Sequence, residues 1–314
     1  MRQDNTVSKR DVLRQEIVAL AEQDVDAESA LRAAFARFWG TAQGEPREIY
    51  DRFIGRSPAA DGVRFEEVDS GPVQGWWCHP ENAVQDRAIL FLHGGAYIQG
   101  SPRAYRGFAS QIATRARAAT FALQYPLAPE QPFPAAPKTA LVAYRWLTES
   151  GFSKIALVGD SAGGGLALVT LAQIAADKAL TQAVAGVMFS PWTDLSQSGS
   201  SMGDPRVTEP LLNRDMIVGA ARTYLGSALP RHPGASPLFG RFAGLPPLLI
   251  QVGSDEILLD DSFRFARLAA NAGVPVKLEI WERLHHVFQL NSAELVSARR
   301  ALDRAGEFLE KAFV

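Results

Sequence analysis

Cysteine is the residue type that this sequence has least of: Cys78 is the single example among 314 residues. One thiol cannot form a disulfide within the chain, so a small scaffold held together by disulfides is excluded. No Cys and His residues recur at the short spacing of zinc ligands either. The sequence therefore predicts no zinc-finger type of metal centre.

Long apolar runs and an excess of charge of one sign are also missing. No stretch approaches the ~18 consecutive apolar residues of a membrane span, and residues 1–16 hold no apolar segment of the signal-peptide kind. Lys and Arg number 32 and Asp and Glu 34, a formal net charge of −2. Such a balance offers no general attraction to nucleic acid or an anionic membrane. We expect a cytoplasmic protein with neither a membrane span nor a nucleic-acid partner.

Apolar residues, in contrast, make up 47 % of the chain and charged residues 21 %. This is the usual balance of a globular protein, which excludes disordered and fibrous classes. At roughly 150 residues per domain, the length suits two domains or one large α/β domain with insertions.

Strand-like and helix-like segments alternate from residue 63 onward. Val63–Val68 and Val73–Cys78 predict an antiparallel hairpin. Six apolar runs that suit strands buried on both faces follow: Ala88–Leu92, Ala119–Tyr125, Ile155–Gly159, Val184–Phe189, Leu248–Val252 and Val276–Trp281. Predicted helices lie between and after them: Arg103–Arg117, Ala135–Glu149, Ala162–Ala176, Asp261–Ala272 and Ser292–Lys311. Asn291 and Glu294 predict a capping box for the last helix. The alternation indicates a mostly parallel sheet of eight strands with helices on both faces.

Two segments interrupt this alternation. Residues 1–60 are helix-like and place four large apolar residues on one face: Leu31, Phe35, Phe38 and Trp39. Residues 191–235 carry a second helical stripe: Leu212, Met216, Ile217, Ala220 and Tyr224. Each stripe is explained either by packing onto the core or by a lid over a pocket, because ligands bind at the carboxyl ends of strands in open α/β sheets.

Residues 159–163 match the pattern G-x-S-x-G, in which Ser161 is the serine. The five-residue pattern alone is weak, but a predicted strand ends just before it and a predicted helix begins just after it. A nucleophile needs this arrangement, since the turn raises the serine Oγ above the sheet and the helix N-terminus places free N–H groups beside it. A phosphate-binding loop is disfavoured, because the Lys of a P-loop and the full G-x-G-x-x-G spacing are absent.

A second glycine-rich motif, His93-Gly94-Gly95-Ala96-Tyr97, follows the predicted strand Ala88–Leu92. Acyl transfer needs N–H donors directed at the developing oxyanion, and glycine lets a substrate approach the backbone closely. The N–H groups of Gly94, Gly95 and Ala162 are therefore the predicted oxyanion hole. The alternative is an ordinary tight turn. The G-x-S-x-G motif at the carboxyl end of another strand of the same sheet disfavours it.

A serine nucleophile needs a base and an acid that orients the base. Only His285 and His286 lie between the last predicted strand and the final helix. The other histidines are expected at a surface strand end, in support of the oxyanion loop and in a solvated loop: His79, His93 and His232. The acid is expected at the end of the sixth or seventh strand, where five carboxylates are available: Asp194, Asp255, Glu256, Asp260 and Asp261.

Taken together, these motifs and the segment Tyr125-Pro126-Leu127-Ala128-Pro129-Glu130 resemble the bacterial hormone-sensitive lipase family of esterases, a branch of the α/β hydrolases. The resemblance covers roughly residues 60–312. Two positions depart from the family pattern. Ala96 replaces the third glycine of HGGG, and Pro126 replaces the arginine of YRLAPE, which removes one partner of a structural ion pair.

The resemblance implies an α/β-hydrolase fold and a triad of Ser161, His286 and Glu256. The family spacing around the acid fits residues 256–260 and selects Glu256 over Asp255, and His-x-Phe at 286–288 selects His286 over His285. It also implies short- to medium-chain ester substrates and no metal or organic cofactor. The expected layout is an N-terminal cap segment (1–60), a core (61–190 and 236–314) and a cap insertion (191–235).

Other activities use the same residues. A lactonase or amidase would need the same triad, and some relatives keep the fold as small-molecule receptors after losing a triad member. All three residues are available here, which favours an enzyme. An epoxide hydrolase or dehalogenase of this fold would need Asp in place of Ser161.

The strand Val276–Trp281 predicts an edge of the sheet, because it is the last strand in the chain. An exposed edge can pair with a second copy, and Lys277 and Glu279 on one face suit pairing across a two-fold axis. The resemblance also implies dimers through this strand. A homodimer through residues 276–281 is therefore expected, with charged protection of a monomer's edge as the alternative.

Overall fold

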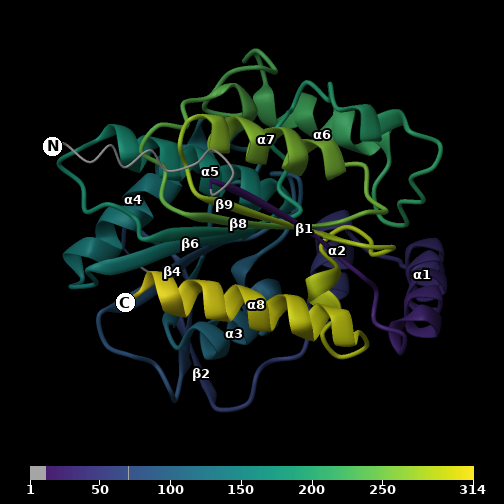
Figure 1. The fold of residues 1–314 in the computed structure, drawn as a ribbon, viewed down its shortest axis with the longest axis horizontal. Helices are drawn as coiled ribbons and strands as arrows, with labels where there is room; N and C mark the ends of the chain where they lie inside the picture. The colour runs from purple at the N-terminus through teal and green to yellow at the C-terminus, as the bar shows by residue number, and fades with distance from the viewer. Residues whose placement is uncertain (1–11, 70) are drawn as a thin grey trace, which may run out of the picture.

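The computed structural model describes residues 12–69 and 71–314, in which nine strands form a single sheet (Figure 1). The strand order is β1-β9-β8-β7-β6-β4-β5-β3-β2, and β3 alone runs in the direction opposite to the other strands. The strands are β1 Leu13–Val18, β2 Val63–Val68, β3 Gly75–Pro80, β4 Arg87–Leu92, β5 Ala119–Leu123, β6 Lys154–Asp160, β7 Ala185–Phe189, β8 Leu248–Gly253 and β9 Val276–Trp281. The predicted hairpin and mostly parallel sheet are confirmed.

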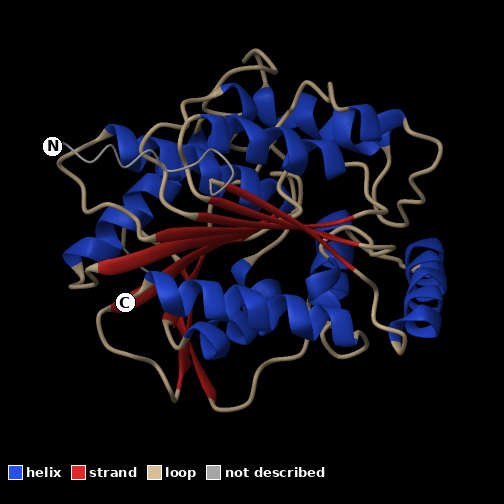
Figure 2. Ribbon diagram, viewed as in Figure 1, coloured by secondary structure: helices blue, strands red, loops and turns tan. Residues whose placement is uncertain are grey.

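Helices cover both faces of this sheet (Figure 2). In Figure 1, α3 and α8 lie below it and α4, α5 and α7 above it, with α1 and α2 at its right end. The helices are α1 Asp24–Thr41, α2 Pro46–Ile54, α3 Pro102–Ala116, α4 Ala135–Glu149, α5 Ser161–Ala176, α6 Arg214–Leu225, α7 Leu259–Asn271 and α8 Val296–Ala312. Strands β7 and β8 are buried along their whole length, which explains their continuous apolar sequence. Among the described helices, none has the length and apolar character needed to cross a membrane.

The N-terminal segment contributes a strand to the sheet, which the sequence did not predict. Strand β1 pairs in parallel with β9, from Leu13 opposite Val276 to Val18 opposite Trp281. The sheet therefore has nine strands rather than eight, and residues 13–18 of the predicted cap segment belong to the core sheet. Residues 1–11 of that segment lie outside the described part of the chain.

Because β1 covers β9, the prediction that residues 276–281 form an edge strand is wrong. Its charged residues are used within the chain: Lys277 forms an ion pair with Glu279, and Glu279 also accepts a hydrogen bond from Arg304 (3.0 Å) and one from Gln251 (2.8 Å). Glu279 is fully buried among these partners. The sheet-edge argument for a homodimer through this strand is thereby removed.

The final helix is capped by a distant residue rather than by the predicted capping box. Helix α8 begins at Val296, four residues later than expected. Asp24 of α1 accepts hydrogen bonds from the backbone N–H groups of Val296 (2.8 Å) and Ser297 (2.6 Å). Asn291 instead faces His285, 3.1 Å away. A carboxylate at a helix N-terminus satisfies free N–H groups and complements the helix dipole.

Each of the two predicted apolar stripes serves both packing and the pocket. In α1, Leu31 and Phe35 are buried against β9 and the C-terminal segments, whereas Trp39 is 41 % exposed and lines a pocket beside Ser161. In the insertion, Tyr224 of α6 stacks on Tyr97, with ring centroids 3.8 Å apart. Met216 of the same helix lines the pocket. Different residues of each stripe thus pack onto the core and line the pocket.

The cap on α8 can be tested by replacing Asp24, which is 1 % exposed. We expect Asp24→Ala to lower the free energy of unfolding by about 2 kcal/mol, since two N–H groups lose a charged acceptor. Chemical denaturation followed by circular dichroism measures this. Asp26→Ala, an exposed carboxylate of the same helix turn, is the matched control. Equal losses in the two variants would contradict the capping role.

Candidate active site

Ser161 lies at the turn between β6 and α5, with its backbone in the left-handed region at φ +52°. The turn is sharp enough that a side chain at Gly163 would overlap the carbonyl oxygen of Leu92 at the end of β4. A side chain at Gly159 would overlap the backbone of Gly163 itself. Glycine at both positions therefore lets α5 begin directly against the strand ends. This geometry presents the Ser161 side chain at the carboxyl edge of the sheet.

Three side chains from separate loops meet at this edge. The Nε2 atom of His286 lies 2.9 Å from Ser161 Oγ, and its Nδ1 atom lies 2.7 Å from Glu256 Oε2. Glu256 follows β8 and His286 follows β9, so the ends of neighbouring parallel strands bring the two together. Ser161 is 9 % exposed, His286 is 6 % exposed and Glu256 is fully buried.

Ser190 orients this arrangement and was not predicted from the sequence. Its hydroxyl donates a hydrogen bond to Glu256 Oε1 (2.8 Å) and accepts one from the N–H of Val287 (3.1 Å). The N–H of Gly253 also donates to Glu256 Oε1 (2.6 Å). Ser190 follows β7 directly, which places it at the carboxyl edge of the sheet next to β8, the strand that precedes Glu256. This position is the sequence feature that could have identified Ser190.

The neighbours of the acid and the histidine face α1 instead. His285 Nδ1 lies 2.8 Å from Glu28, and Asp255 accepts a hydrogen bond from Arg32 (3.2 Å). Arg32 also donates to Glu28 (2.9 Å). Asp255 and His285, the alternatives one residue away from Glu256 and His286, thus hold the N-terminal helix over the site.

The remaining candidate residues have other contacts. Asp194 pairs with Arg264 (3.0 Å), Asp261 accepts two backbone N–H groups from the turn after β7, and Asp260 binds the start of η1 (Ser200–Gly203). None of the three carboxylates contacts His286. His79 lies beside Glu66 at 3.4 Å, and His232 is exposed.

His93 supports the glycine-rich loop. It is fully buried, its Nδ1 atom lies 2.7 Å from the carbonyl oxygen of Gly94, and its ring stacks on Tyr125. Burial lowers the pKa of His93 to about 4, because the charged form would lose its hydration. The imidazole is therefore neutral at physiological pH and acts as a packing and hydrogen-bonding residue of the loop.

The structure corrects one of the predicted oxyanion donors. The N–H of Gly94 donates to the buried carboxylate of Asp160 (2.9 Å), so it is not free for a substrate oxygen. Among the described residues, the N–H groups of Gly95 and Ala96 have no such acceptor. Gly95 and Ala96 take φ +109° and +55°, and successive left-handed residues direct neighbouring N–H groups into one concavity. Ala162, in the first turn of α5, adds an N–H group with no partner inside the helix.

Asp160 links this loop to the N-terminal segment. Its carboxylate accepts a hydrogen bond from the Tyr105 hydroxyl (3.1 Å), which lies 2.8 Å from the hydroxyl of Tyr50 in α2. Burial raises the pKa of Asp160 to about 7, while the bonds from Gly94 and Tyr105 oppose this shift by favouring the charged form.

A second link compensates for the departure at Pro126. Glu130 pairs with Arg47 of α2 at 2.7 Å, and Arg47 also donates to the carbonyl oxygens of Ile98 and Ala128. An arginine from the N-terminal segment therefore supplies the cation that the motif lacks. As an exposed ion pair it contributes little stability by itself, but it fixes α2 beside the glycine-rich loop.

A largely apolar pocket of about 560 Å³ opens onto Ser161 and His286. Its walls come from α1, α2, the glycine-rich loop and residues 210–217 of the insertion. The residues that give it an apolar character are Trp39, Ile49, Phe53, Leu212, Met216 and Ile217. The N-terminal segment and the insertion thus enclose the space in front of the serine.

Charges around His286 adjust its proton affinity. Burial by itself would lower the pKa of His286, but the carboxylates of Glu256, Glu209 and Asp160 raise it, and the pKa lies above the ordinary value of 6.5. Glu209 belongs to the insertion, and burial raises the pKa of its carboxyl to about 7. In residues 12–69 and 71–314, no group of three or more His, Cys, Asp and Glu side chains is arranged to hold a metal ion.

Comparisons with known proteins agree with this geometry. A family model described as the alpha/beta hydrolase fold matches residues 89–290. An acetyl-hydrolase of Streptomyces hygroscopicus is 42 % identical over 283 residues, 87 % of this chain and 93 % of that protein. An esterase of Acinetobacter venetianus is 33 % identical over 250 residues, 79 % and 78 % of the two chains.

Solved structures show the same relationship. The crystal structure of an esterase from the bacterial hormone-sensitive lipase family superposes with a TM-score of 0.87 and 36 % identity, covering 92 % of this chain and 99 % of that one. The chain belongs to the α/β-hydrolase fold family, and within it to the bacterial hormone-sensitive lipase family of esterases.

The raised pKa of His286 leads to a pH prediction. A base must be neutral to accept a proton, so we expect kcat/KM for p-nitrophenyl acetate to rise with pH through an ionisation above about 6.5 and then level off. Initial rates across the neutral range, with circular dichroism as a check on folding, measure the midpoint. A midpoint below that value, or a rate that falls on the alkaline side while the fold is intact, would rule out His286 as the base.

Proposed function

We propose that the protein is a serine carboxylesterase that hydrolyses short- to medium-chain esters through an acyl-enzyme. The observation that carries the proposal is the continuous hydrogen-bonded path from Ser161 Oγ through His286 to Glu256, at 2.9 and 2.7 Å. A serine hydroxyl is a weak nucleophile, and an imidazole within hydrogen-bond distance is the group that activates it.

In the first half of the reaction, Ser161 Oγ attacks the ester carbonyl carbon and His286 Nε2 accepts the hydroxyl proton. His286 then donates this proton to the departing alcohol oxygen, which leaves an acyl group on Ser161. Glu256 remains ionised, keeps the imidazole oriented through Nδ1 and stabilises its cationic form. Because Gly253 and Ser190 hold the other carboxylate oxygen, Glu256 does not need to reorient during the cycle.

The developing oxyanion is received by the N–H groups of Gly95, Ala96 and Ala162. These groups are fixed by the fold before substrate binds, so they stabilise the negative charge without the cost of reorganisation. Asp160 contributes by holding the Gly94 end of the loop rather than by touching substrate.

The pocket supports the proposed substrate range. Its volume of about 560 Å³ and its aromatic and aliphatic walls suit a small ester with a modest acyl or alcohol chain. The name acetyl-hydrolase, given to the Streptomyces relative, points to acetyl groups at the short end of this range. Lactone or amide hydrolysis would use the same residues, and turnover of a panel of p-nitrophenyl esters, lactones and amides ranks these activities.

The nucleophile is tested by Ser161→Ala. We expect turnover to fall on the order of 10⁵-fold with the fold intact, because no other group forms the acyl-enzyme. Labelling with a phosphonate inhibitor followed by mass spectrometry should find the adduct on Ser161. An adduct on a different serine would refute the assignment.

The choice between neighbouring residues is tested by two matched pairs. Glu256→Gln and His286→Asn should lower kcat by about 10⁴-fold. Asp255→Asn should change kcat far less, because Asp255 contacts Arg32 and not the histidine of the site. His285→Asn should instead lower the melting temperature, since the buried carboxylate of Glu28 loses one of its two partners and keeps only Arg32. Kinetics and thermal unfolding of the four variants separate the roles. A larger kcat loss for Asp255→Asn than for Glu256→Gln would assign the acid to Asp255 and contradict the choice of Glu256.

A further inference from the structure

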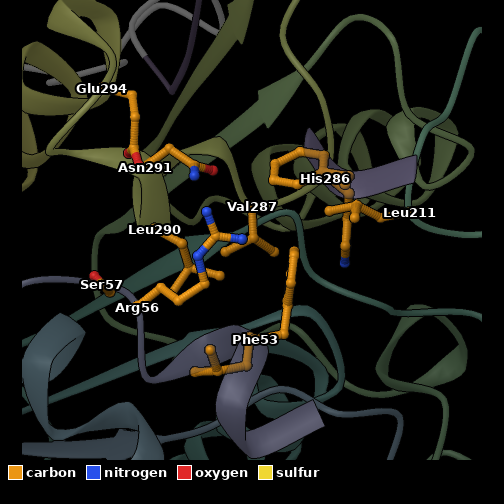
Figure 3. A pocket seen from close by; sticks show the side chains of 11 residues that line it. Phe53, Arg56, Ser57, Leu211, His286, Val287, Leu290, Asn291 and Glu294 are labelled. Carbon is orange, nitrogen blue, oxygen red and sulfur yellow. The ribbon is translucent and has the colours of Figure 1, made fainter. Parts of the chain in front are cut away.

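A small second cavity of about 30 Å³ borders His286 beside the apolar pocket. Figure 3 shows the side chains around it, with the guanidinium of Arg56 pointing toward Val287 and Asn291. The cavity and the apolar pocket share walls from the end of α2 and from residues 286–290. The small cavity has more polar walls than the apolar pocket, because four polar residues line the cavity and not the pocket: Arg56, Ser57, Asn291 and Glu294.

Ser57 joins the wall of the cavity to that of a surface groove. Ser57 lines both the cavity and a polar surface groove of about 500 Å³. Charged and polar side chains form that groove, among them Glu48, Asp51, Arg52, Ser101 and Arg103. Two spaces therefore border His286: an apolar pocket that suits a substrate chain, and a small, more polar cavity that shares Ser57 with the groove.

Several polar groups at the cavity lack partners among the described residues. Ser57 is 8 % exposed, and its buried hydroxyl oxygen makes no hydrogen bond. The guanidinium of Arg56 makes no hydrogen bond or ion pair with residues 12–69 or 71–314. The amide oxygen of Asn291 faces His285, which leaves its amide nitrogen available. A buried hydroxyl without a partner costs free energy, and a water molecule is the usual remedy.

The size of the cavity also fits water. A cavity holds a water when roughly 10–15 Å³ is open to the centre of a water-sized sphere and two to four polar groups surround it. The volume of about 30 Å³ meets the first condition but is too small for an ester or a chain of several carbons. The hydroxyl, guanidinium and amide groups meet the second.

We propose that this cavity supplies the water that hydrolyses the acyl-enzyme, and that Ser57 positions this water on its way from the polar groove to His286. The proposal rests on the acyl-enzyme mechanism above. In the step that it serves, a water O–H proton passes to His286 Nε2 and the water oxygen bonds to the acyl carbon. The bond from that carbon to Ser161 Oγ then breaks, Oγ takes the proton from His286, and the carboxylic acid leaves.

A separate route for water has a physical reason. During deacylation the acyl chain still occupies the apolar pocket, whose aromatic walls hold water poorly. A separate, more polar cavity that borders His286 keeps water next to the base without displacing the chain. The route also distinguishes water from larger nucleophiles, which have access through the apolar pocket alone.

The test measures competition for the acyl-enzyme. The enzyme is given p-nitrophenyl acetate together with 1-hexanol, which is too long for the cavity, and the ratio of hexyl acetate to acetate is determined by gas chromatography. This ratio depends only on steps after acyl-enzyme formation, so it does not matter which half-reaction limits kcat. We expect Ser57→Val, which fills the space with apolar atoms, to raise the ratio of hexyl acetate to acetate about tenfold. A tenfold change corresponds to the loss of about one hydrogen bond to the attacking water. Ser57→Ala should raise the ratio less.

Ser262→Ala is the matched control for Ser57→Ala, because Ser262 also has a buried hydroxyl without a partner among the described residues but lies in α7, away from both spaces. Its ratio should equal that of the wild type. An unchanged ratio in both Ser57 variants would overturn the water route, and so would an equal rise in the control. If the wild type formed no acetyl adduct at Ser161, the proposed function itself would fail, so the two failures are distinguishable.

Discussion

The left-handed turn at Ser161 is the constraint on which the rest of the site depends. A non-glycine residue in this conformation costs of order 1–3 kcal/mol, and here the cost is met by tight packing of α5 against the ends of β4 and β6. The turn has two consequences. It directs the hydroxyl at His286, and it leaves the first N–H groups of α5 free beside it. Any side chain at Gly159 or Gly163 would separate helix from strand and remove both.

The N-terminal segment is an integral part of this site. Its strand β1 completes the sheet, Asp24 caps α8, and Glu28 and Arg32 bind the residues adjacent to Glu256 and His286. Several of these groups are buried, and a buried charge without its partner is costly. Docking of the segment and the geometry of the site are therefore coupled, although Ser161, Glu256 and His286 all come from the α/β core.

The glycine-rich loop is held from two directions. Asp160 binds the N–H of Gly94 from the Ser161 side, and Tyr50 reaches the same carboxylate through Tyr105. Arg47 fixes the other side of the loop through the carbonyl oxygen of Ile98. With its ends fixed in this way, the loop keeps Ala96 in a left-handed conformation that glycine would adopt more easily. Rigid donors of this kind are what electrostatic stabilisation of an oxyanion requires.

The sequence by itself determined the alternation of strands and helices, the position of Ser161 at a strand-to-helix turn and the loops that carry the acid and the histidine, because these features depend on local periodicity and glycine spacing. Choosing Glu256 over Asp255 and His286 over His285 relied on resemblance to a family. Only the tertiary structure shows where each neighbour points, since adjacent side chains in a turn diverge and their partners lie more than 200 residues away in α1. Only the tertiary structure likewise shows that residues 13–18 form β1, that Asp24 caps α8 and that the N–H of Gly94 binds Asp160. Each depends on a contact between distant segments, and no local pattern in the sequence records such a contact.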